Sequence, residues 1–186
     1  MSNVNCRIEV ITGDITAVTA EAIVNAANES LLGGGGVDGA IHRAAGPRLI
    51  AYNRELGGCP TGAAKMTPAF NLRSRGIRYI IHTVGPVWHG DDSAPIGDNR
   101  DDVLLASCYQ QCLGLAAKNG LRTVAFPAIS TGVYRFPKQR AAQIAVDHIA
   151  GWQNERKMPE RVILCCFSQG DAQVYRSVMQ DRGIED

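Results

Sequence analysis

Two carboxamides, four consecutive glycines and one carboxylate lie close together in this sequence. The carboxamides belong to Asn25 and Asn28, the glycines are residues 33–36, and the carboxylate belongs to Asp38. An Asn side chain can both donate hydrogen bonds to sugar hydroxyls and accept them, and a carboxylate can act as a general base. Four glycines are costly to order, so a compact domain keeps them where side chains would obstruct a ligand. We therefore interpret residues 24–42 as an active-site loop.

The glycine run has two other interpretations. Flexible linkers are rich in Ser, Pro and charge, whereas here apolar residues such as Val37 and Ile41 follow at buried-helix spacing. Residues 34–39 also match the dinucleotide-binding pattern G-x-G-x-x-G, in which the glycines follow a strand almost directly and an acidic residue ends the next strand. Here the glycines start well after Asn25, and the acidic candidate, Glu55, falls in a helical pattern. The sequence disfavours both alternatives.

The carboxylate of Asp38 could orient or deprotonate a water molecule. It could also cap the helix predicted over residues 37–45, which would contribute about 1 kcal/mol. His42 lies four residues later on the same helix face, where it could hold Asp38 in place or be structural. His82, in an apolar strand, could be a packed, hydrogen-bonded core residue or a catalyst, and the sequence favours the core role. The sequence has no Ser-His-Asp set and no G-x-S-x-G motif, so it does not predict a covalent acyl-enzyme.

Two further polar stretches follow predicted strands. Asp14 comes after a strand predicted over residues 7–11, where its carboxylate could accept a hydrogen bond from an exocyclic amine or cap a turn. Residues 130–134 follow a buried strand over residues 123–126 and precede a helix that starts near Pro137. Small side chains, a glycine and a following helix N-terminus favour a diphosphate cradle built from backbone N–H groups.

Strands and helices alternate along the chain. This order predicts one α/β domain spanning residues 1–186, a three-layer α/β/α sandwich around a central mixed sheet. The predicted strands cover residues 7–11, 22–24, 63–67, 79–84, 123–126 and 162–167, and the predicted helices cover 37–45, a stretch ending at 56, 103–118, a stretch from about 137, and 171–182.

Lys and Arg number 19 against 18 Asp and Glu, so the charge balance predicts no direct nucleic-acid binding. Arg73, Arg75 and Arg78 are clustered, but a solvated turn explains them. The sequence shows neither a signal peptide nor a run of about 18 apolar residues, so we expect a cytoplasmic protein without a membrane partner.

No pattern in the sequence predicts a metal or another cofactor. Asp98, Arg100 and Asp102 have a spacing typical of calcium loops, but the downstream glutamate is missing, so residues 89–102 are predicted to be an exposed, mobile, solvated loop. The cysteines lack metal-ligand spacing and are expected to be free, buried thiols in a reducing compartment. They are Cys6, Cys59, Cys108, Cys112, Cys165 and Cys166.

Five colinear motifs together resemble the macrodomain family, and within it the hydrolases that act on ADP-ribose esters. The resemblance spans nearly the whole chain, which makes it far more specific than any one glycine pattern. The motifs are Gly-Asp-Ile-Thr at 13–16, the stretch 25–47, Cys-Pro-Thr-Gly-Ala-Ala-Lys at 59–65, Ile-His-Thr-Val-Gly-Pro at 81–86 and the stretch 127–134.

The resemblance implies a role for each candidate residue. Asp14 would accept a hydrogen bond from the adenine amino group, and the backbone at Ile15 would read the ring. Phe167, at a strand end, could stack on adenine or equally cap the core. The other implied substrate-binding residues are Asn25, Gly35, Gly36 and Val37, and, at the diphosphate and proximal ribose, Ser130, Thr131, Gly132, Val133 and Tyr134.

The implied activity is hydrolysis of O-acetyl-ADP-ribose to ADP-ribose and acetate, together with removal of mono-ADP-ribose from Asp and Glu side chains of proteins. Asn28 and Asp38 would be the catalytic residues, with Asp38 activating a water molecule assisted by a substrate phosphate oxygen. A non-catalytic ADP-ribose-binding module could lack both, so their joint presence favours an enzyme. Some similar bacterial proteins are described as regulators of a double-strand-specific ribonuclease, which leaves such a ribonuclease as a further candidate partner.

Overall fold

The computed structural model describes residues 7–186. Within this range, six strands form one sheet. The strands lie in the order β1-β6-β5-β2-β4-β3, and β3 runs antiparallel to β4 while the other neighbours are parallel. The predicted strands and the mixed sheet are confirmed. The bounds are β1 Arg7–Thr12, β2 Ala22–Ala26, β3 Ala64–Pro68, β4 Tyr79–Thr83, β5 Thr123–Phe126 and β6 Arg161–Cys166.

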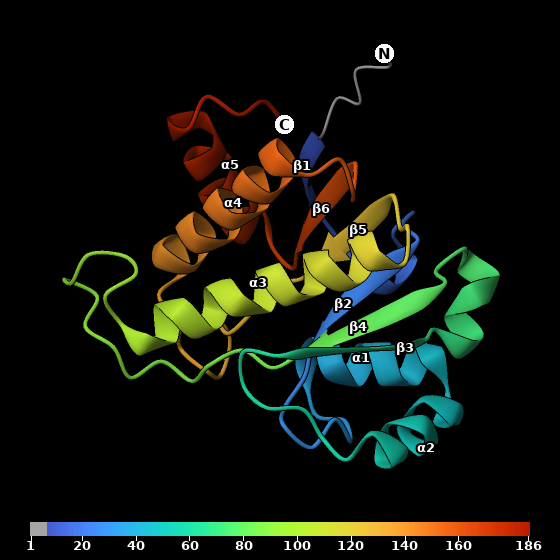
Figure 1. Cartoon of the computed structure of the whole chain (residues 1–186). Coiled ribbons are helices and arrows are strands. Elements are labelled where there is room, and N and C mark those ends of the chain that lie inside the picture. Colours follow the sequence, from blue (N-terminus) through green and yellow to red (C-terminus); the bar gives the residue numbers. More distant parts are fainter. Residues whose placement is uncertain (1–6) are drawn as a thin grey trace.

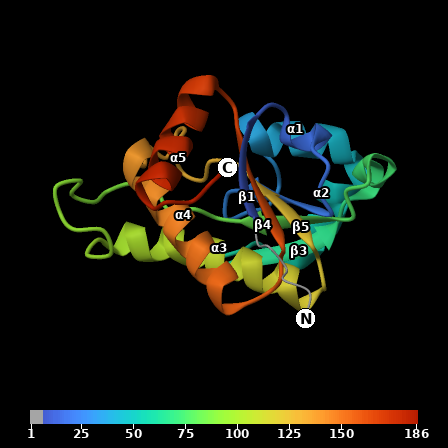
Figure 2. The ribbon, with the colours of Figure 1, turned by 90° about the horizontal axis from the view of Figure 1, so that it is seen from above.

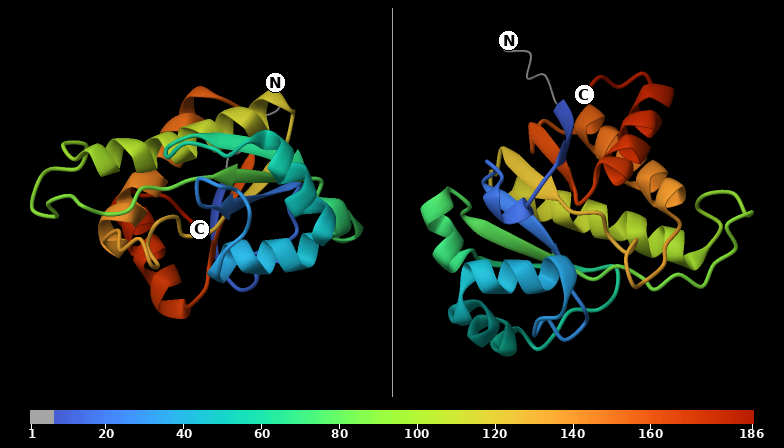
Figure 3. Two further views of the ribbon diagram at one scale, coloured as in Figure 1. Left: turned by 90° about the horizontal axis from the view of Figure 1, so that it is seen from below. Right: turned by 180° about the vertical axis from the view of Figure 1, so that it is seen from behind.

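Helices cover both faces of this sheet. Helices α1 and α2 lie on one face, and α3, α4 and α5 lie on the other (Figures 1, 2 and 3). This arrangement confirms the predicted three-layer α/β/α sandwich. The helices are α1 Gly36–Ala45, α2 Pro47–Leu56, α3 Arg100–Lys118, α4 Lys138–Glu155 and α5 Gln169–Asp181, with short 3-10 helices η1 Ile15–Ala17 and η2 Phe70–Arg75 that the sequence patterns did not predict.

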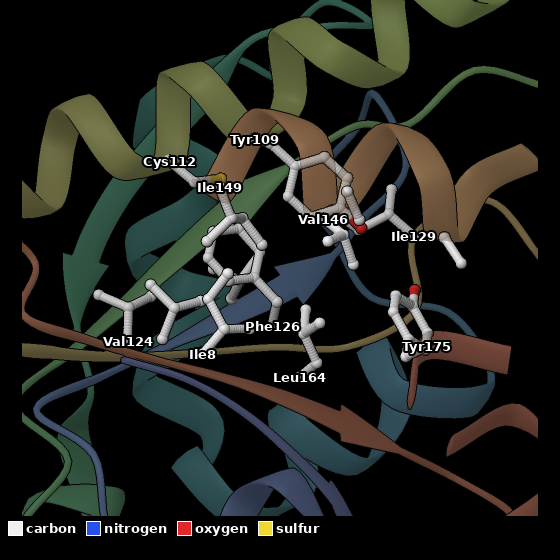
Figure 4. Close-up of a cluster of buried hydrophobic side chains, with 14 of the residues drawn as sticks. Ile8, Tyr109, Cys112, Val124, Phe126, Ile129, Val146, Ile149, Leu164 and Tyr175 are labelled. Atoms are coloured by element: carbon white, nitrogen blue, oxygen red, sulfur yellow. The ribbon is translucent and has the colours of Figure 1, made fainter. Parts of the chain in front are cut away.

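Side chains of the central strand β2 alternate between two cores. Val24 packs into the larger cluster beneath α3, α4 and α5, part of which appears in Figure 4. Ile23 packs into the cluster beneath α1 and α2. Because strand side chains alternate between faces, Asn25 points to the same side as Ile23, where it is fully buried. The strand therefore carries a polar side chain into the α1 layer.

The carboxyl ends of the parallel strands meet at one edge of the sheet. From that edge the chain leaves β2 toward α1 on one face and leaves β5 toward α4 on the other. Neighbouring parallel strands whose connections diverge to opposite faces leave a crevice between them, which is where α/β sheets bind ligands. The topology thus places the active-site loop beside the 130–134 loop.

The prediction for residues 89–102 was wrong at its C-terminal end. Helix α3 begins at Arg100 and not at Val103, because Asn99 and Asp102 form a reciprocal capping box. Asp102 is buried, with its side chain 1% exposed, and forms an ion pair of 2.7 Å with Arg140. Asp102 therefore belongs to the protein interior rather than to a solvated loop.

Arg140 also ties down the remainder of this loop, which projects beyond the N-terminal end of α3 (Figure 1). Its guanidinium donates hydrogen bonds to the backbone carbonyl oxygens of Asp92 (3.3 Å), Ala94 (2.8 Å) and Pro95 (3.0 Å). These long-range bonds oppose the predicted mobility of the segment. None of residues 89–99 lines the main cavity described below.

The cysteines agree with the expectation of free thiols in the part of the chain that is described. Cys59, Cys108, Cys112, Cys165 and Cys166 are unpaired and buried, while Cys6 lies outside the described residues. Across residues 7–186, no group of three His, Cys, Asp or Glu side chains has an arrangement that could hold a metal ion. In the same range, no helix combines the length and apolar character needed to cross a membrane.

Candidate active site

A cavity of about 540 Å³ opens at the carboxyl edge of the sheet. It falls in the range that small-molecule and cofactor sites occupy. Loops after β2, β5 and β6 contribute most of its wall, which brings together residues far apart in the sequence. The predicted residues in the wall are Asn28, Gly35, Gly36, Val37, Asp38, Ser130, Thr131, Gly132, Val133, Tyr134 and Phe167.

Asp14 and Ile15 lie outside the wall of this cavity. The Asp14 side chain caps η1, because its Oδ1 accepts hydrogen bonds from the hydroxyl (2.7 Å) and backbone N–H (2.8 Å) of Thr16. These two bonds hold the pKa of Asp14 below its ordinary value. Both bonds use Oδ1. The thiol of Cys165, a residue of the cavity wall, lies 3.4 Å from the carbonyl oxygen of Gly13, the residue before Asp14. Asp14 therefore stands beside the Cys165 end of the cavity, and Ile15 is buried in η1.

Asn25 is not part of the wall, contrary to the substrate contact that the resemblance implied. Its side chain is fully buried behind Asp38, and its Nδ2 donates a hydrogen bond of 2.8 Å to Asp38 Oδ1. The reason is the alternation of β2, which turns Asn25 toward α1 while the strand's end leads into the cavity. Asn25 supports a site residue from behind.

The Asp38 carboxylate is held on one side and open on the other. Oδ1 receives the Asn25 amide and lies 3.3 Å from His42 Nε2. That His42 nitrogen lacks hydrogen-bond geometry to any partner among the described residues, so Asn25 is the stronger restraint. An added Cβ on Gly34 would lie 3.1 Å from Asp38 Oδ2. Oδ2 therefore faces the glycine backbone of the cavity wall.

Asn28 approaches the same glycine. A Cβ on Gly34 would lie 3.6 Å from Asn28 Nδ2, which shows how the missing side chain leaves room between Asn28 and Asp38. Asn28 is itself oriented by local bonds: Nδ2 donates to the Gly33 carbonyl at 3.0 Å, and Oδ1 accepts from the Ser30 hydroxyl at 2.6 Å. The loop thus holds an amide and a carboxylate around a bare backbone, as the spacing predicted.

Two parts of the cavity wall carry backbone N–H groups without an acceptor in the described part of the chain. The N-terminus of α1 begins at Gly36, and the first N–H groups of a helix have no partner within it. In residues 130–136, the loop's own bonds use the N–H groups of Arg135 and Phe136. Within residues 7–186, the N–H groups from Thr131 to Tyr134 donate to no protein acceptor. The two sets suit an anionic or polar ligand between them.

Two large apolar side chains stand nearly free at the cavity. Val133 is 90% exposed and Phe167 is 91% exposed, and both line it. Phe167 therefore does not cap the core, which was one of the two roles considered for it. An exposed aromatic ring on a cavity wall is suited to stacking on a flat ligand.

The sequence patterns missed several residues of the wall. Lys138, the first residue of α4, forms a 2.7 Å ion pair with Asp171 of α5, and this hydrogen bond holds the pKa of Asp171 below its ordinary value. Gly85 follows the end of β4, so the strand-end rule applied to Asp14 also points to it. The residues missed are Gly85, Pro127, Ala128, Ile129, Lys138, Cys165 and Asp171, whereas Ala26, Ala27 and Gly34 fall within the predicted active-site loop.

Cys165 lines the cavity but lacks the character of a nucleophile. Burial raises the pKa of its thiol to about 11, and the nearby Asp14 carboxylate acts in the same direction. A thiol in this environment is protonated at neutral pH, whereas a reactive cysteine needs a thiolate. Asp38 is thus the wall residue best equipped to act as a base.

A second cavity of about 510 Å³ shares Asn28, Gly85 and Tyr134 with the first. Its remaining lining is Glu29, Ser30, Thr61, Val84 and Val87. Glu29 is held there by a 2.9 Å hydrogen bond from the Thr61 hydroxyl. The shared residues make the Asn28 region the junction between the two cavities.

Comparison with known proteins agrees with the geometry. Residues 24–145 match the model of the Macro domain family. The chain is 48% identical to an Enterobacter cloacae protein named O-acetyl-ADP-ribose deacetylase, over 96% of this chain and 97% of that protein. A solved Oceanobacillus iheyensis macrodomain with ADP has a TM-score of 0.87 and 40% identity, covering 97% of this chain and 94% of that one. A Trypanosoma brucei macrodomain in complex with ADP-ribose has a TM-score of 0.80 and 38% identity, covering 92% of this chain and 68% of that one. The chain therefore belongs to the Macro domain family.

Proposed function

We propose that this protein binds ADP-ribose in the main cavity and hydrolyses esters of its distal ribose, O-acetyl-ADP-ribose first among them. The observation that carries the proposal is the Asp38 carboxylate, buried in the wall and held through Oδ1 by Asn25, with Oδ2 turned toward Gly34 and Asn28. The names of the E. cloacae deacetylase and of the T. brucei complex with ADP-ribose support the same assignment. We further propose that residues 1–186 act as a single macrodomain.

The proposed ligand runs along the cavity from Phe167 to Asn28. Adenine stacks on Phe167, with its amino group donating to Asp14 and its ring beside the Ile15 backbone. The diphosphate and proximal ribose lie against the free N–H groups of residues 131–134, together with Ser130. The distal ribose lies against Asn28 and the glycine backbone, including Gly35, Gly36 and the neighbouring Val37. This order follows the wall from the β6 end to the β2 end.

The proposed reaction is attack of water on the acyl carbon of the ribose ester. Asp38 Oδ2 accepts a proton from the attacking water, assisted by a phosphate oxygen of the substrate, and the new carbon–oxygen bond forms a tetrahedral intermediate. The bond from the acyl carbon to the ribose oxygen then breaks, and that oxygen takes up the proton. The products are acetate and ADP-ribose. Asn28 orients the ribose hydroxyls through its amide.

The same site is proposed to release mono-ADP-ribose from Asp and Glu side chains of proteins. Both substrates are esters of the same ribose, and the second cavity adjoins the wall at Asn28, Gly85 and Tyr134. That cavity gives the protein part of such a substrate a place outside the ADP-ribose site. A ribonuclease partner and a cytoplasmic location stay predictions.

The test is to incubate purified protein with O-acetyl-ADP-ribose and to follow acetate release, while calorimetry measures ADP-ribose affinity. Turnover together with binding is expected. Binding without turnover would instead identify a non-catalytic ADP-ribose-binding module. Failure of both would redirect attention to protein partners, the candidate ribonuclease among them.

Phe167→Ala should weaken ADP-ribose binding by roughly 5- to 150-fold, because stacking of a base on an aromatic side chain contributes about 1–3 kcal/mol. The loss is expected for ADP as well, since both ligands carry adenine. Tyr52→Ala serves as the matched control, because Tyr52 is another exposed aromatic residue and does not line the cavity. Equal affinities of the two variants in calorimetry would contradict the adenine assignment.

Activity should survive dialysis against a strong chelator. The proposed step assigns the proton to Asp38 and the attack to water, so no metal ion is required. The measurement compares acetate release before and after dialysis, with added Mg²⁺ or Zn²⁺ as a further arm. Loss of turnover that one of these ions restores would contradict the mechanism.

A further inference from the structure

We propose that a buried chain of hydrogen bonds, running from Thr67 through His82 and Asn25, holds Asp38 in its reactive orientation. Thr67 and His82 would then be positioning residues for ester hydrolysis, although neither lines the main cavity or the second cavity. The inference rests on the proposed function, since it takes Asp38 as the base. It also assigns a role to His82, for which the sequence favoured a place in the core over a role in function.

The order of the strands brings these side chains together. Asn25 on β2 and His82 on β4 are paired neighbours in the parallel register, so their side chains share the sheet face beneath α1. Thr67 lies on β3, which pairs antiparallel with β4 and follows it at the sheet edge. Asn25 Nδ2 lies 3.1 Å from His82 Nδ1, and Thr67 Oγ1 lies 3.0 Å from His82 Nε2. The chain thus crosses three adjacent strands.

The carboxylate determines the orientation of the Asn25 amide. Nδ2 faces both Asp38 Oδ1 and His82 Nδ1, and its two hydrogens can serve both partners. A flipped amide would instead turn its oxygen toward the Asp38 carboxylate, where two acceptors would repel. Asn25 must therefore donate to His82, and His82 Nδ1 must accept.

This requirement determines the tautomer of His82. With Nδ1 as acceptor, the ring of a neutral imidazole carries its hydrogen on Nε2, which donates to Thr67 Oγ1. The Thr67 hydroxyl donates in turn to the Pro68 carbonyl oxygen at 3.1 Å. Burial lowers the pKa of His82 to about 3, and His42 acts in the same direction. The ring is therefore neutral at physiological pH, which leaves Nδ1 free to accept the hydrogen bond from Asn25.

This chain of hydrogen bonds lowers the stability of the folded protein. Asn25, His82 and Thr67 are at most 1% exposed, and Asn25 Oδ1 has no hydrogen-bond partner among the described residues. A buried acceptor without a partner is unfavourable, and apolar side chains would pack the same layer without it. The hydrogen-bond chain ends at Asp38 in the cavity wall. Asn25 donates to Oδ1 of this carboxylate and leaves Oδ2 open.

The test compares Thr67→Val with Thr67→Ser. Valine keeps the shape of the side chain but removes the acceptor for Nε2–H, which frees the ring to move its proton to Nδ1 and oppose the Asn25 amide. We expect kcat for O-acetyl-ADP-ribose to fall by about 10-fold or more, with KM and ADP-ribose affinity nearly unchanged. Serine keeps the hydroxyl and should restore kcat.

Thr83→Val is the matched control. Thr83 is also a buried threonine of this strand pair, and its hydroxyl donates to the Ala63 carbonyl oxygen at 2.9 Å, but it lies next to His82 and therefore on the opposite face of β4. Its replacement should lower the thermal midpoint without changing kcat of the folded protein. If Thr67 had only a structural role, Thr67→Val would likewise lower the thermal midpoint and leave kcat unchanged.

Nitrogen-15 NMR of the imidazole supplies a readout that does not depend on turnover. The parent protein should show a neutral His82 with its proton on Nε2, and Thr67→Val should shift the ring toward Nδ1 protonation. A parent ring protonated on Nδ1, or unchanged kcat in Thr67→Val, would overturn the inference. A parent that binds ADP-ribose without turnover would instead defeat the proposed hydrolysis and with it the positioning role, whereas the tautomer would still report whether the hydrogen-bond chain exists.

Discussion

Asp38→Ala is expected to lower kcat for O-acetyl-ADP-ribose by about 10²–10⁴-fold, which is the usual contribution of a general base. The remaining wall, including the free N–H groups of residues 131–134 and the ring of Phe167, is untouched by the change. ADP-ribose affinity should therefore stay within a few-fold of the parent value. Acetate release and calorimetry on the same preparation measure the two quantities.

Asp38→Asn tests the charge of Asp38 separately from the hydrogen bond that Asn25 donates to it. An amide oxygen can still accept the hydrogen bond from Asn25, so the buried chain remains, while the negative charge is lost. We expect this variant to be as slow as Asp38→Ala but closer to the parent in thermal stability. Asn28→Ala should also lose turnover, since it removes the amide that lies near Gly34 together with Asp38. An Asp38→Asn protein with parental kcat would show that Asp38 is not the base, since within the described helix α1 the carboxylate makes no capping bond that could explain its place there.

Arg140→Met should destabilise the protein by about 3–5 kcal/mol, the usual cost of removing one partner of a buried ion pair. The Asp102 side chain is 1% exposed and that of Arg140 is 5% exposed, so the substitution leaves a carboxylate buried without its charge partner. It also removes three hydrogen bonds to carbonyl oxygens of residues 92–95. Denaturant unfolding measures the free energy.

Arg182→Met is the matched control for that variant. Arg182 makes a similar two-point contact with Asp147, at 2.7 and 3.0 Å, but both side chains are substantially exposed. An exposed pair contributes about 0–1 kcal/mol, so the control should unfold nearly as the parent does. Similar losses in the two variants would contradict the importance assigned to burial.

The Asp102–Arg140 pair should also make stability depend on pH. Burial by itself would raise the pKa of Asp102, but hydrogen bonds from Arg140 and from the Gly97 backbone outweigh it and hold the pKa below the ordinary value of 3.8. The stabilisation is therefore complete above the unfolded-state pKa and is lost as the pH falls through the lower folded-state value. Below about pH 4, the parent should therefore lose the ion-pair part of its advantage over Arg140→Met, while the hydrogen bonds from Arg140 to the carbonyl oxygens of residues 92–95 do not titrate.

Much of the fold and of the site could be predicted from short windows of sequence. Alternation in residues 7–11, the apolar strands and the glycine-punctuated helices indicated the α/β layers, because side-chain periodicity is a local property. The ends of strands located the Asn28, Asp38 and 130–134 clusters, since parallel strands present their carboxyl ends at one edge. The same local logic failed for Asn99 and Asp102, whose capping box was hidden in an acidic stretch.

What the sequence determined by itself is therefore the inventory: an amide and a carboxylate flanking glycines, a small-residue loop before a helix, and an aromatic residue at a strand end. The tertiary structure alone decided how these groups are supported. It placed Asn25 behind Asp38 rather than in the wall, joined it to His82 and Thr67 across three strands, and paired Asp102 with Arg140. Such contacts depend on the strand order β2-β4-β3 and on helix packing, which bring together residues that no local pattern relates.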